Sequence, residues 1–213
     1  MDFKTPKEPK SYADPRDKRL AREYFLLEEL CKKTSKISFK PAELTKSSGL
    51  PYKYRIFYKV QTIVGIDANN KPIISSGPHE AEITLPPGYP AASDPPIPSM
   101  ISDAWHPNIK SKNPGKGHIC VNMKFISAAE GIDGLVLRIG ELLQYKNYFA
   151  EDRPPYPEDP EVAKWIREIA EPQKFVAPDK PIDNSNLMDG VAVLPPVENK
   201  PEDDSPFTII NQS

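Results

Sequence analysis

The chain has 213 residues, 38% hydrophobic and 27% charged, which suffices for one domain with a modest core and polar extensions. A net charge of −2 gives no general attraction to nucleic acid, and no apolar run reaches the roughly 20 residues of a membrane helix. The first residues lack the apolar stretch of a secretion signal, and two cysteines suit a reducing compartment better than a disulfide framework. We therefore expect a cytoplasmic protein that binds neither nucleic acid nor membranes.

The first part of the chain predicts an arm followed by a helix. Residues 1–13 are polar and contain prolines, which predicts a flexible arm. Asp14 and Pro15 favour a helix start, because aspartate caps helices and proline is preferred at the first helical position. Apolar side chains then recur at helical spacing, so we expect a helix over 15–33, with Cys31 as a core residue on its buried face.

The next segment has the alternation of apolar and polar residues that is typical of strands. Tyr52 to Val64 predicts one long strand, and His79 to Leu85 predicts a second, with His79 as a residue of the sheet face. Shorter strands are expected over 37–40 and 97–104. Together these segments predict an α+β fold in which one helix precedes a four-stranded antiparallel meander.

Two further helices are expected in the second half of the chain. Apolar periodicity predicts one over about 134–146 and another from Asp159 to about residue 171. Residues 172–213 contain seven prolines and scattered acids without sustained periodicity. We therefore predict a folded domain over 14–171 and a proline-rich acidic tail that is disordered or docks on a partner.

The segment from Trp105 to Val121 carries the chemistry. It holds two of the three histidines and one of the two cysteines. Prolines and glycines predict rigid turns around an extended run that ends in Cys120. A thiol presented after a glycine-rich loop suits acyl transfer through a thioester, since thiols are the most nucleophilic side chains near neutral pH.

This segment resembles the active site of ubiquitin-conjugating enzymes. The family places a histidine-proline-asparagine motif before a glycine-x-isoleucine-cysteine sequence, as at His106–Ile109 and Gly117–Cys120. Tyr89-Pro90 and Pro95-Pro96 match the segment that precedes the motif in the family, and the resemblance covers about residues 15–170. The chain departs from the pattern by separating Asn108 and Cys120 by twelve positions, which implies a longer loop between them.

The resemblance assigns roles to particular residues. Cys120 would carry the acyl group, and Asn108 would either stabilise the oxyanion or brace the loop, with His106 as a mainly structural member of the site. In the family a carboxylate near the cysteine assists the acceptor amine, and Asp152 or Asp159 is the candidate here. The incoming thioester supplies the energy, and no C-x-x-C or H-E-x-x-H pattern occurs, so we expect no cofactor and no metal.

The resemblance also implies partners. These are ubiquitin or a ubiquitin-like modifier, an activating enzyme that docks on the basic side chains Lys18, Arg19 and Arg22 of the first helix, and a ligase or target protein. The divergent motif spacing is closer to the stand-alone conjugating proteins of bacterial ubiquitin-like systems than to the eukaryotic enzymes.

Two other functions are compatible with the same residues. One is an inactive adaptor of the same fold that binds a ubiquitin-like protein, although such variants usually lack the cysteine. The other is a cysteine hydrolase that uses Cys120 with His106 or His118, which requires a histidine within hydrogen-bond reach of the sulfur.

Overall fold

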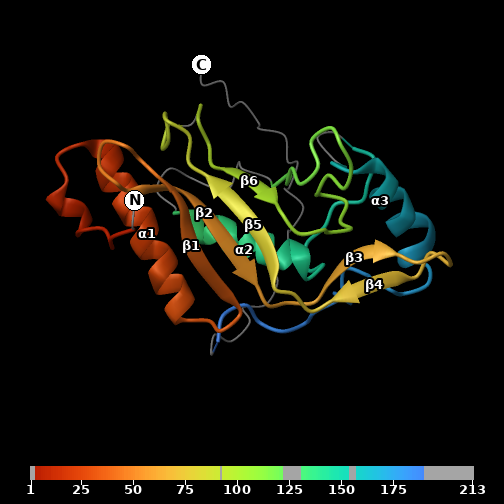
Figure 1. Cartoon of the computed structure of the whole chain (residues 1–213). Coiled ribbons are helices and arrows are strands. Elements are labelled where there is room, and N and C mark those ends of the chain that lie inside the picture. The colour runs from red at the N-terminus through yellow and green to blue at the C-terminus, as the bar shows by residue number, and fades with distance from the viewer. Residues whose placement is uncertain (1–2, 92, 122–130, 154–156, 190–213) are drawn as a thin grey trace, which may run out of the picture.

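The computed structural model describes residues 3–91, 93–121, 131–153 and 157–189 and has an α+β fold (Figure 1). Helix α1 (Pro15–Lys32) precedes a four-stranded antiparallel sheet, and α2 (Ile132–Leu143) and α3 (Pro160–Trp165) follow it. A single π-helical turn over Ile166–Ala170 extends α3. No helix within the described residues is both long and apolar enough to cross a membrane.

Helix α1 begins where the sequence predicts. The Asp14 carboxylate accepts hydrogen bonds from the backbone N–H groups of Arg16 and Asp17 and so caps the helix. Cys31 is half-buried against the core, as expected, and burial raises the pKa of its thiol. The short arm before α1 lies against it in part, since Pro6 is buried and the Phe3 ring lies 5.5 Å from the Tyr24 ring.

The sheet has the strand order β1-β2-β5-β6, built from β1 (Ile37–Leu44), β2 (Pro51–Tyr58), β5 (His79–Thr84) and β6 (Ile97–Met100). The strands predicted over 37–40 and 97–104 are confirmed in kind, although β1 is longer and β6 shorter than predicted, and the strand predicted over His79–Leu85 is β5. Strand β6 ends at Met100 because the next backbone N–H groups, of Ile101 and Ser102, turn to the Glu80 carbonyl.

The prediction of one continuous strand over Tyr52–Val64 is wrong. The chain leaves the sheet after Tyr58 and forms β3 (Thr62–Ile66), which pairs with β4 (Pro72–Ser75) in a separate hairpin. Thr62 and its neighbour Ile63 are both buried, which breaks the alternation of a single strand. The hairpin turn follows the sequence, because the Asp67 carboxylate accepts from two backbone N–H groups of the turn.

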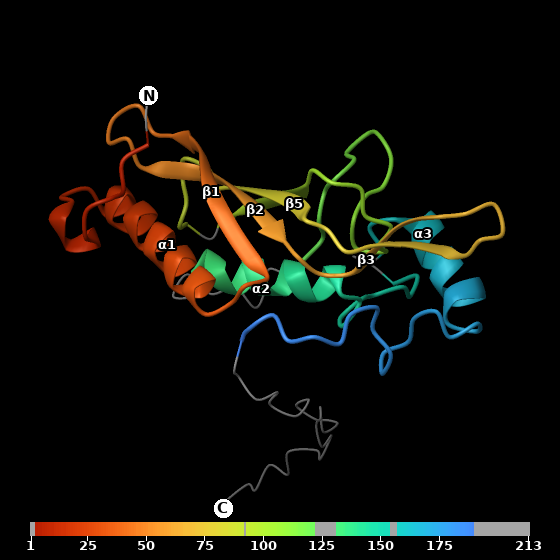
Figure 2. The ribbon, with the colours of Figure 1, turned by 60° about the horizontal axis from the view of Figure 1, so that its bottom comes forward.

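Two apolar clusters hold the chain together. The larger lies between the sheet and helices α1 and α2, which cover the same face of it (Figure 2). Its largest fully buried members include Leu20, Leu27, Tyr54, Ile56, Tyr58 and Ile83. The smaller joins the β3–β4 hairpin to α3 through Ile63, Tyr145, Val162, Trp165, Ile166 and Val176. Ile63 of β3 packs in this second cluster with residues of α3, so the hairpin lies apart from the main sheet.

The ordered chain continues beyond the predicted domain end at residue 171. The segment 182–189 runs beneath α2 as a strap (Figure 2) and is fixed by its backbone as well as its side chains. Leu187 is buried in the main cluster, and the Asp189 carboxylate accepts from the Ser35 N–H at 2.8 Å. Composition alone predicted a tail from residue 172, because the strap gains its contacts only from the tertiary fold. Residues 190–213 of that tail lie outside the described residues.

Candidate active site

A short antiparallel ribbon brings the two halves of the motif together. The Cys120 N–H donates to the Asn108 carbonyl at 2.8 Å, and the Lys110 N–H donates to the His118 carbonyl at 2.9 Å. Between these bonds Ile109 and Ile119 face each other, and both are buried. The twelve-position separation is accommodated as a hairpin loop over 111–116, so Asn108 and Cys120 are direct neighbours through their backbones.

Gly117 anchors this ribbon to the main sheet. Its φ of +90° favours glycine, and a Cβ there would lie 2.3 Å from the Met100 carbonyl oxygen. That close approach allows the Met100 N–H to donate to the Gly117 carbonyl at 2.7 Å. Gly117 lies three residues before Cys120, so its hydrogen bond to β6 fixes the position of Cys120 relative to the main sheet.

Cys120 is a free, half-buried thiol. Burial raises its pKa above the usual value for cysteine, and the negative charge of Glu158 raises it further. The thiol is thus held mainly in its protonated form near neutral pH, which limits uncontrolled reaction.

His106 is an interior residue. It is completely buried, its Nδ1 accepts from the Asn108 N–H at 3.1 Å, and its ring meets Tyr145 edge-on at 4.7 Å between centroids. Burial lowers its pKa to about 3, so the imidazole is neutral at physiological pH. These contacts agree with a structural role for His106 in shaping the turn.

Asn108 has one satisfied and one unsatisfied end. The side chain is fully buried, and its Oδ1 accepts from the Phe149 N–H at 3.0 Å. Its Nδ2 is buried, and no described residue accepts a hydrogen bond from it. A buried donor without a partner costs about 1–3 kcal/mol, and among the described residues the Nε2 of His106 and the Nε1 of Trp105 are buried in the same way. Of these three groups, Asn108 is the one whose backbone pairs with Cys120.

The two aspartates suggested by the sequence lie in different environments. Asp152 is exposed, and no contact within the described residues joins it to Cys120. Asp159 is nearly buried, but its carboxylate already accepts from Ser111 and caps α3 through the Val162 N–H. Its own N–H donates to the Pro107 carbonyl at 3.0 Å, so Asp159 ties α3 to the motif.

The carboxylate whose charge acts on Cys120 belongs instead to Glu158. Its Oε1 lies 3.2 Å from His118 Nδ1, and its charge acts on Cys120. The sequence alone does not reveal this residue, because only the docking of α3 on the motif brings residue 158 to the ribbon. A weak signal was available, since Glu158 directly precedes the cap of a helix that follows the motif.

The basic side chains of α1 divide into two groups. Lys18 and Arg22 are exposed, as a docking surface requires. Arg19 instead turns inward, where it forms an ion pair with the buried Glu23 and lies over the Tyr89 ring. Arg19 therefore serves the packing of α1 and is not presented to a partner.

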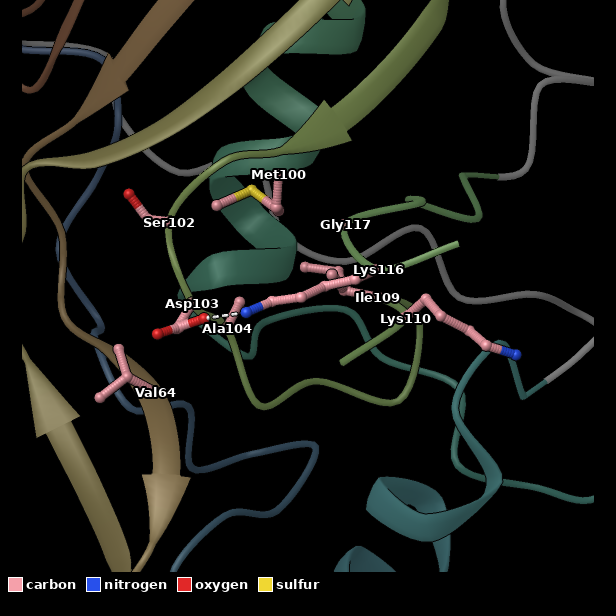
Figure 3. Close-up of a pocket in the computed structure, with 9 residues that line it drawn as sticks. All are labelled: Val64, Met100, Ser102, Asp103, Ala104, Ile109, Lys110, Lys116 and Gly117. Atoms are coloured by element: carbon pink, nitrogen blue, oxygen red, sulfur yellow. Dashed lines mark hydrogen bonds and ion pairs between the residues drawn. The ribbon is translucent and has the colours of Figure 1, made fainter. Parts of the chain in front are cut away.

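A shallow pocket lies on the side of the ribbon that faces β6 (Figure 3). Lys116 reaches across it to Asp103, with the two charged groups 2.7 Å apart. The Lys110 side chain points away from this pair (Figure 3). Among the described residues, no three His, Cys, Asp or Glu side chains gather closely enough to hold a metal ion.

Comparisons with known proteins do not assign the chain to a group. No protein-family model matches it, and no curated protein sequence matches it.

Proposed function

We propose that the chain is a conjugating enzyme for ubiquitin or a ubiquitin-like modifier, which carries the modifier as a thioester on Cys120. The observation that carries this proposal is the backbone pairing of Cys120, a half-buried thiol, with Asn108, a buried amide whose Nδ2 has no acceptor among the described residues. The motif resemblance and the α+β order of elements support the same function.

The reaction would proceed by two exchanges of an acyl group. The Cys120 thiolate attacks the modifier's thioester carbonyl, and the carrier's thiolate leaves. An acceptor amine then attacks the new thioester, a C–N bond forms, and the C–S bond breaks to return the Cys120 thiolate. The Asn108 amide donates to the oxyanion of the tetrahedral intermediate, and the amine's proton passes to Glu158, the carboxylate that acts on Cys120.

The proposal includes partners and a compartment. Lys18 and Arg22 remain on the exposed side of α1 and suit an activating enzyme with an acidic docking surface. Both cysteines are free, which fits the reducing cytoplasm. A bacterial ubiquitin-like system, with a target protein or a ligase as a further partner, remains part of this proposal.

A cysteine hydrolase is the second candidate, and one observation favours it. His118 lies on the ribbon two residues before Cys120, and Glu158 contacts its Nδ1 as an orienting carboxylate would. Within the described residues, however, no histidine forms a hydrogen bond with the Cys120 sulfur. The adaptor function has no specific structural observation in its favour.

A chemical thioester separates these functions without a matched activating enzyme. The protein is loaded with a short peptide ending in Gly-Gly, supplied as its mercaptoethanesulfonate thioester, and is then mixed with lysine. We expect Cys120 to acquire the peptide and pass it to lysine at least about 100-fold faster than the unbound thioester does. Cys120→Ala is the control and should form no thiol-sensitive adduct at this position.

Each other outcome contradicts the conjugating function. Discharge to lysine at the solution rate would show that the site does not catalyse transfer. Discharge mainly to water would identify a hydrolase. A folded protein whose Cys120 does not load would leave only the adaptor.

A further inference from the structure

Three lysines lie between the two halves of the motif, at positions 110, 112 and 116, and they differ in whether a carboxylate pairs with them. Lys112 is paired with Glu161, and Lys116 is paired with Asp103 at 2.7 Å. No described residue forms an ion pair or a side-chain hydrogen bond with the ammonium group of Lys110. Its amine is the one of the three that is not held by a carboxylate within the described residues.

The backbone of Lys110 is nevertheless fixed. Its N–H donates to the His118 carbonyl at 2.9 Å, and its carbonyl accepts from the Gly117 N–H at 2.8 Å. The point from which the side chain starts is therefore rigid relative to Cys120, while the side chain itself can rotate.

The ribbon places Lys110 on the face that carries the thiol. Ile109 and Ile119 form the facing pair, so Lys110 lies opposite His118. His118 and Cys120 are two residues apart on one extended side of the ribbon, so their side chains lie on the same face. Lys110 and Cys120 are then diagonal neighbours, which lie roughly 7–8 Å apart in an antiparallel pair, with their Cβ atoms somewhat closer. The flexible four-carbon stem of lysine spans such a gap to a carbonyl on the sulfur.

We propose that Lys110 is a built-in acceptor, so that a modifier carried on Cys120 is transferred to the chain's own Lys110 when no other amine is present. This rests on the proposed function. The neutral Lys110 amine attacks the thioester carbonyl, forming a C–N bond as the C–S bond breaks and the Cys120 thiolate leaves. The amine's proton goes to Glu158, on the same side of the ribbon. The product is a stable amide that leaves a bulky group beside the thiol and ends further turnover.

The test follows the loaded protein over time without added lysine. The Gly-Gly peptide thioester loads Cys120, the excess is removed, and mass spectrometry locates the peptide before and after treatment with reductant. We expect a reductant-resistant adduct on Lys110 that grows as the thioester decays, at a rate independent of protein concentration. In Lys110→Arg the adduct should be absent and the thioester should persist at least about ten-fold longer.

Substitutions of the other two lysines serve as matched controls for Lys110→Arg. Lys112→Arg and Lys116→Arg retain their ion pairs and should change neither the adduct nor its rate. An adduct spread equally over the three lysines, or no adduct on Lys110, would overturn the inference. Thioester transfer to added lysine would in that case still support the proposed function. Failure of the wild-type protein to form the thioester would refute the proposed function itself.

Discussion

Two buried polar side chains, Glu23 and Asn108, differ in how fully their atoms are used. Glu23 on α1 is completely buried, and both its oxygens have partners: Oε1 accepts from the Tyr89 hydroxyl at 2.7 Å, and Oε2 accepts from the Ile132 N–H at 2.8 Å. Arg19 balances its charge. Glu23 thus caps α2 from another helix, where the N-cap residue Gly131 has no side chain to do so.

Asn108 is buried to the same extent, but it keeps a donor without an acceptor among the described residues. The comparison teaches that burial alone does not separate a structural polar group from a functional one. A saturated group contributes to folding, whereas an unsaturated one such as Asn108 Nδ2 or His106 Nε2 is retained at some cost in stability, and Asn108 differs from His106 in pairing with Cys120 through its backbone.

The largest expected effect is on folding, from Glu23→Ala. This variant leaves Arg19, the Tyr89 hydroxyl and the first turn of α2 without their buried partner. We expect the free energy of unfolding, measured with urea, to fall by about 3–5 kcal/mol. Glu29→Ala on the exposed side of α1 is the control and should change little, because its pair with Lys32 is solvated. Equal losses of unfolding free energy in both variants would show that the buried Glu23 contributes no more to stability than an exposed glutamate.

Asn108→Ala should slow acyl transfer from Cys120 strongly while it lowers the free energy of unfolding only slightly. Removing the donor to the oxyanion should slow transfer from Cys120 to lysine by about 10²–10³-fold, measured as decay of the loaded thioester. The loss of the bond to the Phe149 N–H should lower the free energy of unfolding by only about 1–2 kcal/mol. A large stability loss with an unchanged transfer rate would make Asn108 the structural equivalent of Glu23.

The smallest expected effect concerns the thiol itself. The Glu158 carboxylate raises the pKa of Cys120, so Glu158→Gln should lower that pKa and increase the thiolate fraction near neutral pH. Alkylation of Cys120 by iodoacetamide at pH 7.5, followed on its own peptide, should become about two- to three-fold faster.

A matched variant three residues further along the chain, in the first turn of α3, tests the specificity of this effect. Glu161 is exposed and paired with Lys112, so Glu161→Gln should leave the alkylation rate unchanged. Unchanged alkylation in Glu158→Gln as well would show that burial alone sets the pKa of Cys120.

Elements whose signals lie within a few residues were predicted well. Asp14-Pro15 marked the start of α1, and Asp159-Pro160 marked that of α3. Predictions that depended on distant contacts were less accurate. Helix α2 begins at Ile132, earlier than expected, because Glu23 caps it from α1. The strand predicted over Tyr52–Val64 divides because Ile63 packs in the cluster of α3.

The sequence by itself determined where α1 and α3 begin, the strands β1, β5 and β6 in kind, and the choice of Cys120 and Asn108 as candidates, because caps, alternation and motif residues act over short stretches of chain. Only the tertiary structure decided that Arg19 faces inward and that Glu158 is the carboxylate that pairs with His118 and acts on Cys120, while Asp159 serves as a helix cap. The physical reason is that charge and burial depend on which segments meet in space. The meeting of α3 with the motif is set by packing across about 40 residues, which no local pattern encodes.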